Sequence, residues 1–423
     1  MSLARILPWP ALRLAILVLS FGLGHGARAQ TFQEAAFLAL AKDPRIASAT
    51  AAANAQEARL LQIEAGGRPQ LISSIDLNED EGAQSLGTAS LELSQELYSF
   101  GRLASSIEAA EESVTLAWIE VAQVNQDVIA DVMTAYTNVL QADELVALRR
   151  AHRDELQQRS DAIIERIEAG LAGITELQAL GRRVAEAEVA LLRAEQQSEI
   201  SRLELQRLTG EFVGRVEGRQ LRRYIRLLPT SRDEAIFMAE NNSPETLVSQ
   251  QRFRIVDAEI KAQNRANNPS IQAYSTYSYS IEYAGEGSAA NDEIGVRVSL
   301  PLIQGGLRSA VAQEGEQNRE EALRLRQQDQ LLIIEATAIA WTNVEIAHRA
   351  VTVWTRSVDL YQDQLIAIQN EVDADLATIA DLLDVRSELV NTQAELITAN
   401  YDVLRSQIIL LRTLGLASLI SDL

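Results

Sequence analysis

Hydrophobic residues recur at helical spacing along two long stretches of this chain. In the first stretch they lie three or four positions apart, at Val121, Val124, Val128, Val132, Ala135, Val139, Ala142 and Val146. This heptad-like spacing is typical of a helix that packs along another helix. Because no proline interrupts the chain between Pro69 and Pro229, we expect one helix over about residues 102–168, which would be roughly 100 Å long at about 1.5 Å per residue.

Four shorter segments instead alternate strictly between apolar and polar residues. They cover about residues 71–77, 89–94, 271–283 and 293–300. A period of two indicates a strand with one apolar and one polar face. A charge such as Arg297 faces lipid only at a high cost, so we expect the polar faces to look into water. On the apolar side of the third segment, Tyr277, Tyr279 and Tyr283 either form a girdle at a membrane interface or reflect the high strand propensity of tyrosine.

The same order of elements occurs twice. Motifs of the first half recur about 200 positions later, among them Asp43-Pro44 as Ser243-Pro244, and Ala135-Tyr136-Thr137-Asn138-Val139 as Ala340-Trp341-Thr342-Asn343-Val344. The second half repeats the heptad-like stripe at Ile333, Thr337, Ala340, Val344, Ala347 and Val351. This period is far too long for a solenoid, so it indicates an internal duplication.

The duplication divides the chain into four parts: a leader at 1–29, a first repeat at 30–215, a connection at 216–232 and a second repeat at 233–423. Each repeat is expected to hold a helix, two strands and then long helices. In the first repeat we expect a single helix over about 31–66, because Gly66-Gly67-Arg68-Pro69 is a helix-breaking sequence.

The first 29 residues have the features of a secretory signal. Arg5 precedes a mostly apolar run from Ala11 to Gly24, and Ala27-Arg28-Ala29 offers a small-residue cleavage site before Gln30. A membrane anchor is the alternative, and it is weaker because the apolar run is too short to span a bilayer comfortably.

Charge and cysteine content narrow the possible functions. The chain has 59 acidic and 38 basic residues, for a formal net charge of -21. Such an acidic chain is a poor candidate for binding nucleic acid, and a charged path through it would favour cations. The absence of cysteine excludes disulfides, thiol catalysis and thiolate metal sites.

The sequence lacks the motifs of an enzyme. Its three histidines are His25, His152 and His348, and they lie far apart. We find no phosphate-binding loop, no Ser-His-Asp order and no metal-ligand spacing. Carboxylates are interleaved with arginine along the expected helices, as on a solvated coiled-coil surface. We therefore expect no catalytic residue, no metal and no cofactor.

Four strands with one apolar face pose a problem of assembly. After the leader, no segment approaches the roughly 18 consecutive apolar residues of a membrane helix, so the chain would enter a membrane only as a closed β-barrel. A barrel needs at least about eight strands, and we expect identical chains to pool theirs, with the helices continuing the wall as a tube. The alternative is a secreted coiled-coil scaffold with no role in transport.

Specific motifs resemble the TolC family of outer-membrane factors over essentially the whole chain after the leader. The family's strand-to-helix turn, usually Leu-Phe-x-Gly-Gly, is similar to residues 97–102 and 301–306, with Phe100 where a first glycine is usual. Its C-terminal signature resembles Thr378-Ile379-Ala380-Asp381-Leu382-Leu383-Asp384, followed by Leu389, Asn391, Ala394, Tyr401 and Leu414-Gly415.

The resemblance implies a mainly α chain with a small β part. It implies a homotrimer in which an α-helical coiled-coil barrel is continued by a 12-stranded transmembrane β-barrel, with four strands from each chain. It also implies a place in the outer membrane of a Gram-negative bacterium, in contact with outer-membrane lipid and extending into the periplasm.

The resemblance further assigns roles to residues at the helix ends. Asp381 and Asp384 match carboxylates that line the narrow periplasmic entrance of similar channels and would form cation-binding rings in a trimer; a solvated acidic turn is the alternative. Similar proteins often carry an arginine in place of Ala377, so a salt bridge from this position is absent here. The turns that similar proteins present to a periplasmic membrane-fusion adaptor correspond to Gly170, Leu171, Ala172, Leu376, Ala377 and Thr378; surface turns without a partner are the alternative.

Three glycines have an architectural interpretation. Gly101, Gly305 and Gly306 lie where a strand must turn sharply into a helix, and glycine permits the backbone angles that such a turn requires. We assign them no binding role.

These observations predict an export duct that works with an inner-membrane transporter, either ABC-type or proton-driven, and with a periplasmic adaptor. The variant turn at Phe100 is similar to that of family members serving type I secretion of adhesins, which makes a protein the first expected cargo. Efflux of drugs or other small molecules is the alternative.

Overall fold

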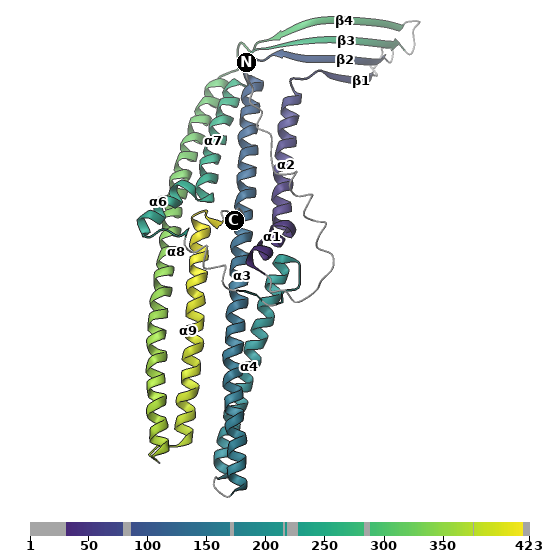
Figure 1. The fold of residues 1–423 in the computed structure, drawn as a ribbon. Helices are drawn as coiled ribbons and strands as arrows, with labels where there is room; N and C mark the ends of the chain where they lie inside the picture. Colours follow the sequence, from purple (N-terminus) through teal and green to yellow (C-terminus); the bar gives the residue numbers. More distant parts are fainter. Residues whose placement is uncertain are drawn as a thin grey trace.

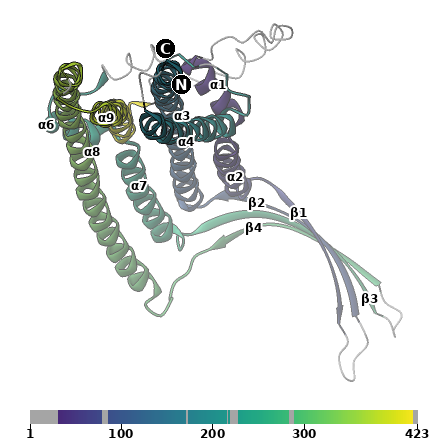
Figure 2. The ribbon, with the colours of Figure 1, turned by 90° about the horizontal axis from the view of Figure 1, so that it is seen from below.

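The computed structural model describes residues 31–78, 86–169, 173–214, 216–217, 227–282, 288–374 and 376–417. Long helices run side by side, and a curved sheet of four strands projects from one end of them (Figure 1, Figure 2). This is the mainly α chain with a small β part that the sequence predicts. The expected leader, Tyr283 and most of the connection at 216–232 lie outside the described residues.

The helices and strands follow the same order in both halves. In the first half they are α1 (Phe32–Lys42), α2 (Pro44–Ala65), β1 (Gln70–Asn78), β2 (Leu86–Tyr98), α3 (Arg102–Glu168) and α4 (Ile174–Thr209). In the second half they are α6 (Arg232–Asn242), α7 (Pro244–Arg265), β3 (Ser270–Glu282), β4 (Ser288–Ser299), α8 (Leu307–Asp373) and α9 (Ile379–Thr413). Both α3 and α8 contain 67 residues, and α3 has the predicted bounds. The internal duplication is confirmed.

One prediction is wrong: residues 31–66 form two helices, α1 and α2, and not one. Asp43 caps the start of α2, where its carboxylate accepts a backbone hydrogen bond. Pro44 is the first residue of α2, a position at which its missing N–H group costs nothing because that group has no partner within the helix. The second half breaks at the equivalent Ser243-Pro244.

The strands form one antiparallel sheet in the order β1-β2-β3-β4, so β1 and β4 are its outer strands and the two halves of the chain meet where β2 pairs with β3. The two predicted faces continue across all four strands. An apolar row crosses Leu71, Leu93, Ser275 and Ile294, and the adjacent row on the other face crosses Ile72, Glu92, Thr276 and Glu293. Tyr277 and Tyr279 lie on the apolar face as predicted, opposite Leu91 and Ala89.

Left-handed backbone angles mark both strand-to-helix turns. Gly101 has a φ of 84° before α3, and Gly306 has a φ of 88° before α8, angles that glycine adopts readily. One residue earlier, Gly305 has a φ of 57°, whereas the equivalent residue of the first half is Phe100 with a φ of 50°. A Cβ atom crowds the backbone at such an angle, so residues other than glycine rarely adopt it.

The main core lies about midway along the helices, where α1, α3, α4 and α9 meet (Figure 1). Phe32 packs edge-on against Tyr136, with ring centroids 5.9 Å apart. The predicted seam on α3 is buried at Val121, Val128, Val132, Ala135, Val139 and Ala142, which confirms that it packs against other helices. None of the helices in the described part of the chain is long and apolar enough to cross a membrane.

Candidate functional site

The turn between α8 and α9 lies at the end of the helices opposite the sheet (Figure 1). Beyond the last turn of α8, the backbone N–H groups of Leu376 and Ala377 donate to the carbonyl oxygen of Glu371, at 2.8 and 3.3 Å. These hydrogen bonds use a carbonyl that the helix end would otherwise leave unpaired. The side chain of Leu376 is 80% exposed. The turn is therefore closed by its own backbone and presents an apolar side chain to solvent.

Thr378 and Asp381 together cap the start of α9. The N–H group of Asp381 donates to the Thr378 hydroxyl at 3.2 Å, and the Asp381 carboxylate accepts from the N–H group of Thr378 at 3.0 Å and from its hydroxyl at 2.6 Å. This reciprocal pairing is a capping box. The hydroxyl and the backbone N–H of Thr378 hold the pKa of Asp381 below its ordinary value. The carboxylate is therefore charged at neutral pH.

Asp384 lies one helical turn beyond Asp381 and is held by a different hairpin. Its carboxylate forms an ion pair with Arg183 of α4, and both side chains remain partly exposed. Arg183 also contacts Glu186 of its own helix at 2.9 Å. The two carboxylates that the sequence singles out thus differ: one caps its own helix, and the other joins α9 to α4.

A second arginine connects α9 to α3. Arg386 donates to the carboxylate of Glu155 from both Nη2 and Nε, the latter at 3.1 Å. Arg159, one turn along α3, donates to the same carboxylate at 3.1 Å. Burial acts to raise the pKa of Glu155, but the hydrogen bonds and charges of the two arginines outweigh it and lower the pKa. Glu155 is therefore an ionised link between the two hairpins.

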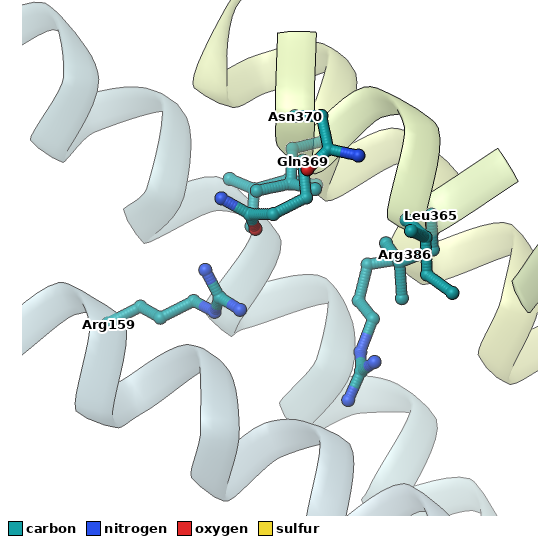
Figure 3. A pocket seen from close by; sticks show the side chains of 8 residues that line it. Arg159, Leu365, Gln369, Asn370 and Arg386 are labelled. Atoms are coloured by element: carbon teal, nitrogen blue, oxygen red, sulfur yellow. The ribbon is translucent and has the colours of Figure 1, made fainter. Parts of the chain in front are cut away.

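The same two guanidinium groups border a groove between α3 and the α8–α9 hairpin (Figure 3). The groove has a volume of about 320 Å³ and is lined by Arg159, Leu365, Ile366, Gln369, Asn370, Leu382, Leu383 and Arg386. No carboxylate, hydroxyl or imidazole is part of this lining, so the groove offers neither acid–base nor nucleophilic chemistry.

A small core beneath these ion pairs joins the two hairpins. Leu383 of α9 packs with Leu156 of α3 and Leu180 of α4. His152 of α3 is buried nearby, and its Nδ1 atom has no hydrogen-bond partner among the described residues. Burial lowers the pKa of His152 from its ordinary value of 6.5, so the ring is neutral in the folded chain at neutral pH.

The structure brings Thr378, Asp381 and Asp384 together at the tip of the second hairpin. The predicted tip residues Gly170, Leu171 and Ala172 lie outside the described residues. Gly101, Gly305 and Gly306 belong to the opposite end of the helices, at the sheet (Figure 1). The roles of the tip residues in binding cations and an adaptor stay predictions.

Three residues of the tip were not anticipated: Arg183, Arg386 and Glu155. Each looks like an ordinary charged residue on a helix surface, and the partner of Arg183 lies 201 positions away in the chain. No local pattern could have identified these pairs. Within the described ranges, no cluster of three or more histidines or carboxylates could hold a metal ion.

Comparison with known proteins adds family-level information. The model of the family described as "Outer membrane efflux protein" matches residues 37–211 and 235–416, one segment in each repeat. Outer membrane efflux protein BepC of Brucella suis biovar 1 (strain 1330) is 22% identical over 398 residues, covering 93% of this chain and 87% of BepC. Outer membrane protein TolC of Escherichia coli (strain K12) is 20% identical over 341 residues, covering 78% of this chain and 69% of TolC.

Solved structures show the same fold. A membrane protein from Pseudomonas aeruginosa superimposes with a TM-score of 0.74 at 18% identity, covering 91% of this chain and 90% of that protein. CusC, whose structure was solved in a study of folding and transmembrane channel formation, also has a TM-score of 0.74, at 17% identity, covering 94% of this chain and 95% of CusC.

Proposed function

The chain belongs to the outer membrane efflux protein family, and on this premise we propose that it is the exit duct of a three-part export system. As a member of this family it is an outer-membrane channel protein and not an enzyme. The proposal adds that three copies assemble around a water-filled path, that a periplasmic adaptor docks at the helical tips, and that an inner-membrane transporter, ABC-type or proton-driven, delivers the cargo.

The observation that carries this proposal is an exposed apolar stripe along α8. Its residues are spaced seven positions apart and are each more than half exposed: Leu325, Leu332, Ile339, Ile346, Val353 and Leu360. An exact seven-residue repeat follows one side of a helix in a left-handed supercoil. The buried stripe of α8, at Ile333 and Ala340 among others, packs in the core beside α6 and α9, so the other stripe stays more than half exposed among the described residues.

A second copy of the chain offers the matching surface. Helix α4 has its own exposed apolar residues at Val189, Leu192, Ile200 and Leu203. The hairpin of α3 and α4 lies beside the hairpin of α8 and α9 (Figure 2), so α8 of one copy can pack against α4 of the next around a ring. Contacts of this head-to-tail kind close into rings when the rotation permits.

The sheet supports the same arrangement. Its outer strands β1 and β4 would each pair with the next copy, and three copies would provide twelve strands, enough to close a barrel around water. The apolar face, with Leu71, Ile75 and Ile294 exposed, would then contact lipid. The face with Glu92 and Glu293 would line the lumen and favour cations.

At the other end, we place the entrance at the α8–α9 tip. Three copies of Asp381 and Asp384 would form rings of negative charge, and the ion pair of Asp384 with Arg183 would resist opening by holding α9 to α4. The adaptor would contact the tips at Gly170, Leu171 and Ala172 of the first hairpin and at Leu376, Ala377 and Thr378 of the second. The exposed side chain of Leu376 supports an apolar contact there.

For the cargo, we favour a protein such as an adhesin, exported by type I secretion. The support is the first strand-to-helix turn, in which Phe100 takes the left-handed position that Gly305 holds in the second half. Export of small molecules is the second candidate, because the relative BepC is described as an efflux protein.

Two experiments test this function. The purified chain, reconstituted in a planar bilayer, should be trimeric and conduct ions with cations preferred; a monomer that stays soluble without detergent would contradict the proposal. Deletion of the gene should abolish the release of a large secreted protein if the cargo is a protein. If deletion instead causes only the accumulation of dyes and drugs inside the cell, the second candidate is correct.

A further inference from the structure

The polar face of the sheet contains a single basic side chain. Among the described residues of β1 to β4, Arg297 of β4 is the only lysine or arginine. Its row of the sheet runs through Gln272 of β3 and Glu96 of β2. On the same face, Glu92 and Glu293 lie nearer the middle of their strands. Arg297 is therefore one positive charge on a face that otherwise carries carboxylates.

Arg297 contacts an aromatic ring and not a carboxylate. Its guanidinium carbon lies 4.6 Å from the centre of the Tyr274 ring of β3, in a cation–π contact. Glu96, the carboxylate in its own row, pairs instead with Arg102 of α3. Among the described residues, Arg297 forms no ion pair. Its positive charge is thus not neutralised within this part of the chain.

Three neighbours hold the Tyr274 ring against the sheet. Its partner across the strands is Gly295, and a Cβ atom there would lie 2.9 Å from the Tyr274 hydroxyl oxygen and 3.0 Å from the ring. Glycine in a strand permits such a close approach, so the ring lies across β4 at this point. The hydroxyl group donates to the carboxylate of Glu293, and Arg297 covers the ring face.

The ring separates two opposite charges of one strand. Arg297 and Glu293 are four residues apart on the same face of β4, or about 13 Å at about 3.4 Å per residue. The Tyr274 ring lies between them, with its hydroxyl on Glu293 and its face under Arg297. A guanidinium group that stacks through its flat face keeps the N–H groups along its edge free. Those N–H groups are the ones that bind a carboxylate in two parallel hydrogen bonds.

We propose that Arg297, positioned by Tyr274, is a contact site for carboxylate groups of the cargo. The inference rests on the proposed function, in which three copies of the sheet close around water with this face inward. Three copies of Arg297 would then form a ring of positive charge at one level of an otherwise acidic lumen. Rings of arginine or lysine favour anions in pores.

The range of this charge determines which cargo it affects. At physiological ionic strength, charges are screened over about 8 Å, so small ions that pass along the centre of a wide lumen are little affected. A cation preference of the conductance, set by the more numerous carboxylates, is therefore compatible with this ring. A cargo that touches the wall meets the guanidinium edges directly. Its carboxylates belong either to an acidic polypeptide or to a small organic acid.

Block of single-channel current by acidic probes tests the site. Hexaglutamate or citrate is added from the sheet side of trimers in a planar bilayer, and the residence time of each block is measured. Arg297 is exposed, so Arg297→Gln should assemble as the wild type does. Its residence time for hexaglutamate should fall by about tenfold, as expected from the loss of three exposed ion pairs.

Two controls exclude a general effect of charge. Arg193→Gln changes an exposed arginine of α4, far from the sheet (Figure 1), and should leave the residence time of hexaglutamate unaltered. Hexalysine should not leave the Arg297→Gln channel sooner than it leaves the wild type. A residence time of hexaglutamate that falls equally in Arg193→Gln and Arg297→Gln would overturn the assignment to Arg297.

A pair of substitutions tests the positioning role of Tyr274. Tyr274→Leu removes the ring, so Arg297 can reach Glu293. The residence time of hexaglutamate should then fall nearly as far as in Arg297→Gln, although the arginine is present. Tyr274→Phe keeps the ring without its hydroxyl and should retain most of the wild-type residence time. A residence time in Tyr274→Leu equal to that of the wild type would refute the positioning role.

The outcomes separate this inference from the proposed function. If the chain forms no conducting trimer, the proposed function fails. If trimers conduct and both probes block Arg297→Gln for as long as the wild type, only the carboxylate site is refuted. A shorter residence for hexaglutamate alone supports the site with a polypeptide as its ligand. A shorter residence for citrate as well supports the site with small organic acids among its ligands.

Discussion

The guanidinium group of Arg183 on α4 forms an ion pair with the carboxylate of Asp384 on α9. This contact joins the two helical hairpins near their tips. In similar channels an arginine at the position of Ala377 often forms a salt bridge there, which alanine cannot form. In this chain, Arg183 of the α3–α4 hairpin pairs with Asp384, whereas position 377 of the α8–α9 turn holds an alanine and cannot form a salt bridge.

Loss of this ion pair should make the entrance open more often. For partly exposed pairs the expected contribution is about 0.2–1 kcal/mol, so Arg183→Gln should raise the ratio of open to closed entrance by up to about fivefold per copy. Single-channel recording in planar bilayers measures this ratio. Arg193→Gln changes an exposed arginine of the same helix and serves as the control. An open fraction that is the same in both variants would show that Arg183 does not lock the entrance.

The carboxylates of Asp381 and Asp384 should determine block by divalent cations. In the double variant Asp381→Asn with Asp384→Asn, divalent ions added from the entrance side should block conductance less, because three copies of each residue would otherwise attract them. Asparagine at 381 can still accept the hydrogen bonds from Thr378, so α9 should keep its cap. The matched control is Asp359→Asn with Asp363→Asn, which changes two exposed carboxylates within α8. Equal relief of block in both double variants would mean that only total charge matters.

Stability should fall as the medium becomes mildly acidic, because of His152. Burial holds the pKa of this ring below its ordinary value of 6.5, so below that pH the unfolded chain takes up a proton that the folded chain does not. The midpoint of thermal unfolding should therefore decrease between about pH 7.5 and pH 5.5, the range in which histidine titrates.

His152→Leu should remove most of this pH dependence, since a buried apolar side chain has no proton to bind. His348→Gln alters an exposed histidine of α8 and should leave the decrease in place. Circular dichroism of the detergent-solubilised protein at several pH values gives the midpoints. A midpoint for His152→Leu that falls with acidity as steeply as that of the wild type would contradict the assignment.

The exposed stripe of α8 should hold the assembly together. Ile346→Asp places a charge in the middle of this stripe and should convert the trimer to monomers, since each buried isoleucine contributes about 1.5–3 kcal/mol and a buried charge adds a further cost. Thr352→Asp introduces the same charge on the polar side of α8 and should leave the trimer intact. Light scattering in detergent reports the mass. If both variants remain trimers, the exposed stripe of α8 is not part of the interface between copies.

The exposed leucine at the α8–α9 tip should contribute to adaptor binding. Leu376→Glu changes a side chain that makes no core contact, so the trimer should fold and conduct as before. Its affinity for a periplasmic adaptor should fall by about tenfold or more, the cost of losing one well-buried apolar contact. Surface plasmon resonance with the purified adaptor measures the affinity. Unaltered binding by Leu376→Glu would place the docking surface elsewhere.

Much of this architecture follows from local patterns. The heptad-like spacing from Val121 to Val146 predicts α3, and the absence of proline and the glycine at 101 predict its limits. The alternation around Arg297 predicts both a strand and the face that it shares with Glu92 and Glu293. The duplication predicts that the helices and strands of one half recur in the other, and the equal lengths of α3 and α8 confirm it.

Other features have a signal in the local sequence that hydrophobic periodicity does not show. Asp43-Pro44 recurs as Ser243-Pro244, and each pair is a capping residue followed by a proline suited to the first position of a helix. That chemistry ends one helix and begins another, which is why residues 31–66 are two helices. The stacking of Arg297 on Tyr274 has no such signal, because it depends on how β3 pairs with β4.

By itself, the amino-acid sequence determined where helices and strands lie and which side of each is apolar, because periodicity is a property of neighbouring residues. Only the tertiary structure decided that Arg183 meets Asp384, that Arg386 meets Glu155, and that Arg297 stacks on Tyr274. Ion pairs and ring contacts depend on distances between side chains that are far apart in the chain, and many arginines and aromatic residues have the same local surroundings. Folding selects among them through the packing of whole helices and strands.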